Sequence, residues 1–269
     1  MKRLTVLFST FLLCTTLYAQ PGKYVETNGA KIYYETYGEG EPLLLLHGFS
    51  LSHKAWGAWI EDLAKQHFLI IPDLRGHGNS TNPSGVYTAA VAADDMYGLI
   101  NHLKIDRFQA MGQSAGAIIL THMAIMDTTR ISDMILVSGT SYLPESTRAA
   151  FKNITYDAWR EHMEPHHPGG EAQIRNLIGQ LHALADSNEV NFTSAQLSTI
   201  TCPTLIIHGD RDRFYSLDIP VKSYQAIPKS YLWVVPNAGH TPAGVYDRGS
   251  VWSDVFLKVI GDFFTGEWK

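Results

Sequence analysis

Short apolar runs alternate along the chain with segments in which apolar residues return every three or four positions. The runs predict buried strands and the returning pattern predicts amphipathic helices, an alternation typical of a mostly parallel sheet flanked by helices. Asn28 and Gly29 form a turn dipeptide between two such runs and predict an opening hairpin. We expect strands at residues 23–26, 31–37, 43–46, 68–71, 108–111, 135–137, 205–207 and 232–235, and helices along 56–63, 96–103 and 251–264.

Residues 141–200 interrupt this rhythm, because they contain no strand pattern. The apolar positions across 174–184 form one helical face, and Thr193 with Gln196 has the spacing of a helix-capping box. A structureless loop of this length is uncommon inside a compact domain. The sequence therefore predicts a small helical lid at 141–200, inserted into an α/β core made of residues 20–140 and 201–269.

The composition is that of one globular domain. The chain has 269 residues, of which 45% are hydrophobic and 17% charged, and Lys plus Arg number 21 against 26 for Asp plus Glu. No run of like charge is present that could hold a polyanion. We therefore expect a small-molecule substrate and no nucleic-acid partner.

Residues 1–19 have the pattern of a cleaved secretory signal peptide. Lys2 and Arg3 precede an uncharged apolar run that closes at Ala19. The run is shorter than the about 20 residues that a bilayer span needs. A lipid anchor on Cys14 is disfavoured by the bulky residue before it. We expect cleavage after Ala19, export to the periplasm or the medium, and no stable membrane anchor afterwards.

The clearest chemical pattern is the G-x-S-x-G string at 112–116, which falls between a predicted strand and a predicted helix. On such a sharp turn a serine is held in a strained backbone conformation with its hydroxyl exposed. The helix N-terminus behind it points backbone N–H groups at any anion that develops there. Ser114 is thus the predicted nucleophile.

A serine nucleophile needs a base, and the base needs an acid. His240 follows the last predicted strand, and Asp210 and Asp212 follow the strand at 205–207. These groups and Ser114 would all lie at the carboxyl ends of strands, where ligands bind in parallel sheets. His240 would take the serine proton and an aspartate would orient its ring. From the spacing alone, Asp210 and Asp212 both remain candidates for the acid of the triad.

With these segments the chain resembles the α/β-hydrolase fold family over residues 23–266. The resemblance rests on the elbow, acid and base segments, on the His-Gly-Phe string at 47–49, and on the D-x-R-G-x-G-x-S string at 73–80. It implies an α/β-hydrolase fold, with a mostly parallel sheet flanked by helices and a small helical lid.

The resemblance also assigns roles within the expected site. It implies that Asp212 is the acid, and that the backbone N–H groups of Phe49 and Ala115 form the oxyanion hole. It implies no cofactor. We expect no metal either, because the histidines at 162, 166 and 167 match no metal-ligand spacing.

The expected activity is hydrolysis of a small carboxylic ester or lactone through an acyl-enzyme on Ser114. A serine at the elbow excludes family members that attack with an aspartate, and G-Q-S-A-G differs from the G-x-S-W-G of proline iminopeptidases. A perhydrolase of the haloperoxidase type, a carbon–carbon bond hydrolase or an acyltransferase would use the same triad. A ligand receptor without turnover is disfavoured, because all three triad positions are filled.

Aromatic residues of the lid that lie outside its apolar helical face are candidates for binding substrate. They are Tyr142, Phe151 and Trp159. A roof lined by such side chains should favour short to medium apolar acyl groups.

Overall fold

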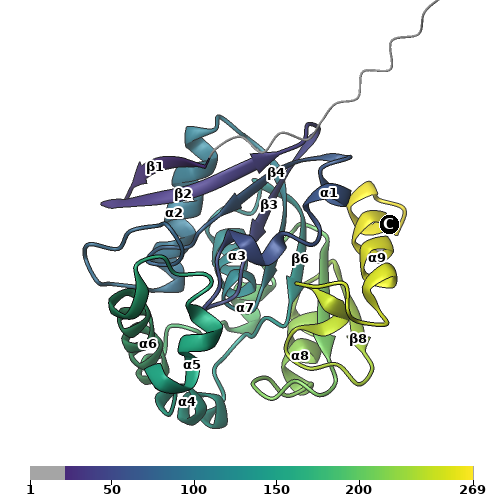
Figure 1. The fold of residues 1–269 in the computed structure, drawn as a ribbon. Helices are drawn as coiled ribbons and strands as arrows, with labels where there is room; N and C mark the ends of the chain where they lie inside the picture. The colour runs from purple at the N-terminus through teal and green to yellow at the C-terminus, as the bar shows by residue number, and fades with distance from the viewer. Residues whose placement is uncertain (1–21, 269) are drawn as a thin grey trace, which may run out of the picture.

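A mixed sheet forms the centre of the molecule (Figure 1). The computed structural model describes residues 22–268, and within them the sheet has eight strands in the order β1-β2-β4-β3-β5-β6-β7-β8. The pairs β1–β2 and β2–β4 are antiparallel, and the remaining neighbours are parallel. The strands are β1 (Lys23–Thr27), β2 (Ala30–Tyr37), β3 (Glu41–Leu46), β4 (His67–Pro72), β5 (Phe108–Gln113), β6 (Ile131–Val137), β7 (Thr204–Gly209) and β8 (Ser230–Val235). The predicted α/β class and opening hairpin are confirmed.

The leucines of β3 show why the central strands are apolar throughout. Successive side chains of a strand point to opposite faces of the sheet. Leu44 and Leu46 accordingly belong to one apolar layer, and Leu43 and Leu45 belong to the other. All four are fully buried. A strand covered on both faces needs an unbroken aliphatic run, because neither face meets water.

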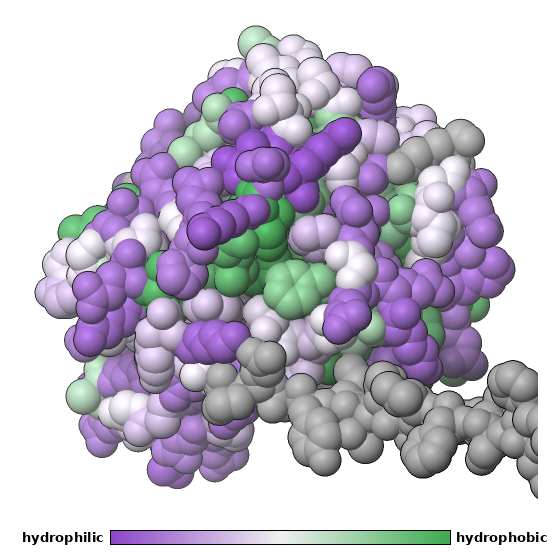
Figure 2. Space-filling view, turned by 90° about the horizontal axis from the view of Figure 1, so that it is seen from above, coloured by the Kyte–Doolittle hydropathy of each residue, from purple (hydrophilic) through white to green (hydrophobic). Residues whose placement is uncertain are grey.

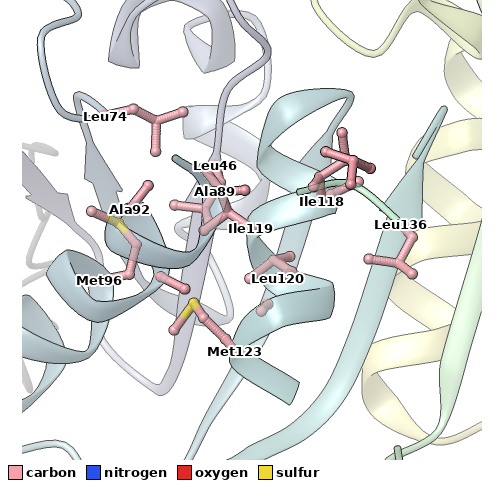
Figure 3. Close-up of a cluster of buried hydrophobic side chains, with 14 of the residues drawn as sticks. Leu46, Leu74, Ala89, Ala92, Met96, Ile118, Ile119, Leu120, Met123 and Leu136 are labelled. Carbon is pink, nitrogen blue, oxygen red and sulfur yellow. The ribbon is translucent and has the colours of Figure 1, made fainter. Parts of the chain in front are cut away.

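Helices cover both faces of the sheet and complete the two layers. On the first face, Met96 and Met123 come from two helices and belong to one apolar cluster with the strand residues Leu46 and Leu136 (Figure 3). The first layer is formed by α2 (Ala89–His102), α3 (Ala115–Met126) and α8 (Asp218–Ala226), and the second by η1 (His53–Trp56), α1 (Ile60–Leu63), η2 (Pro242–Gly244) and α9 (Ser253–Thr265).

The helix predicted along 56–63 is instead two short turns. The first ends at Trp56 and the second begins at Ile60. Trp56 and Trp59 are both buried in the second layer, and Trp59 Nε1 donates a hydrogen bond of 2.9 Å to the carbonyl of Val245. Gly57 follows Trp56 in the sequence, and a glycine inside a helix destabilises it. Packing of the indoles therefore decided the local structure here.

The segment between β6 and β7 is helical and lies over one side of the first layer (Figure 1). Thr193 and Gln196 make the reciprocal capping-box bonds that their spacing predicts. The apolar face from Ile174 to Leu181 is buried in the first layer. The helices of this lid are α4 (Glu145–Lys152), α5 (Tyr156–Met163), α6 (Gly170–Asp186) and α7 (Ser194–Leu197).

Figure 2 shows one face on which hydrophilic residues surround a small, hollowed apolar area. Among residues 22–268, no helix combines the length and the hydropathy that crossing a membrane requires. The signal peptide predicted at 1–19 lies outside the described residues, so cleavage after Ala19 and export stay predictions from the sequence.

Candidate active site

Ser114 lies on a tight turn between β5 and α3. Its backbone has φ 52° and ψ −113°, a conformation that non-glycine residues rarely adopt. A Cβ atom on Gly112 would lie 2.5 Å from the backbone of Gly116, and one on Gly116 would lie 2.3 Å from the carbonyl oxygen of Leu46. Only glycine fits at both positions. The G-x-S-x-G string is therefore required by close backbone packing around the serine.

The structure brings Ser114, His240 and Asp212 together. His240 Nε2 lies 2.9 Å from Ser114 Oγ, and His240 Nδ1 lies 2.7 Å from Asp212 Oδ2. A ring that donates its Nδ1 proton to the carboxylate leaves Nε2 free to accept the serine proton. The Asp210 side chain instead faces Arg211, at 3.9 Å, and is partly exposed. The geometry thus places Asp212, and not Asp210, at the histidine.

Asp212 is held as a carboxylate by the turn that follows it. Its Oδ1 accepts hydrogen bonds from the backbone N–H groups of Phe214, at 2.8 Å, and Tyr215, at 3.1 Å. Burial alone would raise the pKa of Asp212, but the hydrogen bonds from His240 and from these two amides outweigh it, and the pKa is lowered. The buried group is therefore charged and can stabilise an imidazolium.

A small cavity opens beside the Ser114 hydroxyl. Its volume is about 30 Å³ and its lining is mostly apolar. The proposed oxyanion residues Phe49 and Ala115 both lie in its wall. Ala115 is the first residue of α3, where backbone N–H groups have no partner within the helix. The lining residues are Phe49, Tyr87, Ala89, Ser114, Ala115, Ile118, Phe151, Leu181, Leu184, Val190 and Tyr215.

Of the three lid aromatics proposed to bind substrate, Phe151 lies in the wall of this cavity. Tyr142 and Trp159 are not among the described residues that line it. The Tyr142 hydroxyl points toward Asp218, at 3.3 Å. The Trp159 ring packs edge-on against His162. A role for Tyr142 and Trp159 in binding substrate therefore stays a prediction from the sequence, and among the three aromatics only Phe151 lines this cavity in the described residues.

A wider groove of about 910 Å³ lies between the loop at 76–85 and α6. None of the triad residues lines it. We therefore place the substrate in the small cavity, where the lining includes Ser114.

Comparison with known proteins identifies the fold family of this chain. A family model described as alpha/beta hydrolase fold matches residues 41–172. The chain belongs to the α/β-hydrolase fold superfamily. It is similar to the AB hydrolase superfamily protein YisY of Bacillus subtilis, with 28% identity over 251 residues that cover 81% of this chain and 92% of that protein.

Two further relatives span nearly the whole length of this α/β-hydrolase. The 2-hydroxy-6-oxo-2,4-heptadienoate hydrolase of Pseudomonas putida is 23% identical over 286 residues, covering 94% of this chain and 99% of that protein. The solved structure of Est816, described as an N-acyl homoserine lactone degrading enzyme, superimposes with a TM-score of 0.73 at 24% identity, covering 90% of this chain and 100% of that one. The second likeness shows the shared fold.

A chain of hydrogen bonds that no sequence pattern indicated joins three loops of this α/β-hydrolase. The N–H of Gly48, which precedes Phe49, donates to the Tyr246 hydroxyl at 2.8 Å. Tyr246 donates to Gln113 Oε1 at 3.0 Å, and Gln113 Nε2 donates to the carbonyl of His240 at 2.9 Å. The oxyanion loop, the elbow and the histidine loop are thus fixed relative to one another. Gln113 occupies the first x position of the G-x-S-x-G string. Its place in that string was the only feature of the sequence that could have drawn attention to it.

Histidines tie the lid to the oxyanion loop. His162 Nε2 lies 3.0 Å from Ser50 Oγ, and His166 Nδ1 lies 2.9 Å from Ser52 Oγ. His167 Nε2 lies 3.0 Å from the carbonyl oxygen of Ser50. Within residues 22–268, no cluster of three or more His, Cys, Asp or Glu side chains is arranged to hold a metal ion. The role that the structure gives these histidines is to fasten the lid.

Acid should weaken this fastening at His167. The N–H of Gly78 donates to His167 Nδ1 at 3.1 Å, so that nitrogen carries no proton. Burial lowers the pKa of His167 to about 4, against about 6.5 in an unfolded chain. The lowered pKa of His167 therefore contributes to the free energy of unfolding in full above about pH 6.5. This contribution is lost as the pH falls toward 4, because over that range the unfolded chain takes up the proton and the folded protein does not.

We expect the change to be measurable by urea unfolding at about pH 7 and about pH 5. His167→Gln should reduce the acid-induced fall in unfolding free energy by about 2 kcal/mol relative to the wild type. His102→Gln, at an exposed position in α2, is the matched control and should leave the fall unchanged. An equal fall in the wild type and His167→Gln would contradict the assigned role.

Proposed function

We propose that this protein is a serine hydrolase that cleaves a small carboxylic ester or lactone through an acyl-enzyme on Ser114. The observation that supports it most directly is the hydrogen-bonded series from Ser114 Oγ through His240 to Asp212, at 2.9 and 2.7 Å, beside a small apolar cavity. These are the parts that nucleophilic acyl transfer requires.

In the proposed reaction, His240 Nε2 takes the Ser114 proton as Oγ attacks the substrate carbonyl. The carbonyl oxygen becomes negative and is stabilised by the N–H groups of Phe49 and Ala115. The leaving oxygen then takes the proton from His240, which leaves an acyl-enzyme. A water molecule, activated by the same histidine, releases the acid and restores Ser114.

The cavity bears on the size of the substrate. The cavity is small and its wall consists of leucine, isoleucine, valine, alanine and aromatic side chains, which suits a short apolar acyl group. A long acyl chain would require the lid residues Phe151, Leu181 and Leu184 to move. We therefore propose short-chain esters and small lactones as the substrate class.

The test is a substrate panel with the purified protein. We expect turnover of p-nitrophenyl acetate and butyrate and of small lactones, and a steep loss of kcat/KM for p-nitrophenyl decanoate. Est816, with the same fold, is described as degrading a lactone. The Pseudomonas putida relative is named a 2-hydroxy-6-oxo-2,4-heptadienoate hydrolase. This dienoate is therefore included in the panel to test the alternative of carbon–carbon bond hydrolysis.

Two further assays separate the remaining alternatives. Hydrogen peroxide added with a carboxylic acid would yield a peracid from a perhydrolase, and an added alcohol would yield a new ester from an acyltransferase. Turnover of the dienoate without turnover of any ester or lactone would overturn the proposal in favour of carbon–carbon cleavage.

A further inference from the structure

Tyr246 lies in the middle of the hydrogen bonds that join the three loops of the site. Its hydroxyl accepts the Gly48 N–H at 2.8 Å and donates to Gln113 Oε1 at 3.0 Å. Gln113 Nε2 then donates to the carbonyl oxygen of His240 at 2.9 Å. Each polar atom in the series has its partner, and the reaction described above gives Tyr246 no part.

Gly48 matters to catalysis because its carbonyl group and the Phe49 N–H belong to one peptide group. In a trans peptide the N–H points opposite to the carbonyl, so fixing one fixes the other. The Gly48 carbonyl accepts the N–H of Leu51 at 3.3 Å and lies 2.7 Å from His47 Nδ1. Among residues 22–268, no hydrogen bond uses the Phe49 N–H. That group is therefore available to an oxyanion.

Tyr246 holds the other side of Gly48. Only the two backbone rotations of Gly48 separate its own N–H from the peptide group that carries the Phe49 N–H. Glycine has more freedom in these rotations than any other residue. A Cβ atom at this position would lie 2.2 Å from Gln113 Oε1, so the close approach of the two loops requires a glycine here. The bond to Tyr246 restrains the rotations that the glycine would otherwise leave free.

We propose that Tyr246 is a positioning residue, which holds the oxyanion donor at Phe49 and the base His240 at a fixed separation through Gln113. The donor and the base lie on different loops, after β3 and after β8, and could otherwise move independently. The proposal rests on the serine-hydrolase function given above and adds the means by which its loops are aligned.

This alignment has its largest effect in the transition state. The acyl oxygen gains negative charge only as Ser114 attacks, and a donor stabilises the charge only within hydrogen-bond distance of the position that the oxygen then takes. A displacement of about 1 Å can lower a rate by about 100-fold. Binding of the substrate before the attack depends much less on the donor. Loss of the Tyr246 hydroxyl should therefore lower kcat and leave KM nearly unchanged.

The variant that tests the proposal is Tyr246→Phe, which removes one oxygen. The ring, which packs edge-on against the buried Trp56 with centroids 5.3 Å apart, is kept. The Gly48 N–H and Gln113 Oε1 lose the partner that they share.

The matched control is Tyr97→Phe. It removes a tyrosine hydroxyl that donates to the carbonyl of Met123 at 2.7 Å, near the far end of α3. Both variants lose one hydrogen-bonding hydroxyl, but only Tyr246→Phe loses it between the loops of the site.

The measurement is the affinity for a transition-state analogue. Butylboronic acid adds to a serine hydroxyl and forms a tetrahedral adduct, and its inhibition constant follows from the protection that it gives Ser114 against labelling by a fluorophosphonate. We expect this constant to rise about 10-fold or more in Tyr246→Phe. In Tyr97→Phe it should stay within about twofold of the wild type, and KM for p-nitrophenyl butyrate should do so in both variants.

A purely structural role for Tyr246 would give a different result. Fewer folded molecules would lower kcat, but the inhibition constant of those that remain would be unchanged. Gln113→Met breaks the series at its next member and should raise the constant in the same way. If the two side chains act as one unit, the double variant should stay within about twofold of the more damaging single variant. Thermal midpoints show which variants are folded, and either single variant alone can decide the test.

An inhibition constant of Tyr246→Phe equal to that of the wild type would overturn the proposal, and so would effects of the two substitutions that multiply. Both outcomes are distinct from failure of the proposed function. A wild-type protein that is not labelled at Ser114 would count against the serine hydrolase itself. Labelling without turnover of any ester or lactone would count against the substrate class alone.

Discussion

Replacing Ser114 with alanine is expected to abolish ester and lactone hydrolysis, with kcat lowered by about 10⁴-fold or more. The reason is that Ser114 Oγ is the atom 2.9 Å from the base, and alanine leaves nothing at that position to form the acyl-enzyme. Activity on p-nitrophenyl butyrate, measured at substrate saturation, checks the prediction.

The control for this variant is a measurement of its thermal stability, which shows whether the protein is still folded. Alanine keeps the Cβ atom, so the strained turn at φ 52° and the close contact between Gly112 and Gly116 are unchanged. The thermal midpoint should therefore stay close to that of the wild type. If Ser114→Ala kept even about a tenth of wild-type turnover, Ser114 would not be the nucleophile.

Asp212→Asn is expected to reduce kcat by about 10⁴-fold, as removal of the orienting carboxylate does in serine proteases. Oδ1 of Asp212 accepts two backbone N–H groups, so the amide oxygen of asparagine must take that place. Its NH₂ group then faces His240 Nδ1, where Asp212 Oδ2 lies at 2.7 Å. The imidazole would be forced to carry its proton on Nε2, which could no longer accept one from Ser114.

Asp210→Asn is the matched control, two residues away on the same loop. The nearest charged partner of Asp210 is Arg211, at 3.9 Å, and this contact does not reach the triad. We expect kcat of this variant to stay within about twofold of the wild type. Equal damage by both substitutions, or greater damage at 210, would show that the acid has been assigned to the wrong carboxylate.

The sequence was sufficient for the elements whose cause is local. The aliphatic run at 43–46, the turn at Asn28 and Gly29, and the capping pair Thr193 and Gln196 each depend on neighbours a few residues away. Strand, turn and helix cap therefore follow from the pattern. The elbow could also be recognised from the sequence, because its glycines and its serine are contiguous, although the backbone of Leu46 that requires Gly116 is distant in the chain. The helix along 56–63 was the exception, since its tryptophans are buried by residues distant in sequence.

Only the tertiary structure decided which distant groups meet. Asp210 and Asp212 both follow β7 and both carry a carboxylate, so the sequence could not distinguish their roles. In the structure, Asp212 contacts His240 and Asp210 faces Arg211. Tyr246 and Gln113 become partners across 133 positions of the chain. Tyr215 lines the same cavity as Ser114 although the two residues are far apart in the sequence, and its N–H donates to Asp212.

The lid shows the same division between sequence and structure. Its helices were predictable from their periodicity, but the choice of Phe151 over Tyr142 and Trp159 as a cavity residue depends on how those helices are seated on the core. Periodicity records which side of a helix is buried and carries no information about which neighbour it meets. The sequence by itself therefore determined the fold and the chemistry of the nucleophile. The positions of the supporting donors were decided by long-range packing, because their partners are adjacent only in space.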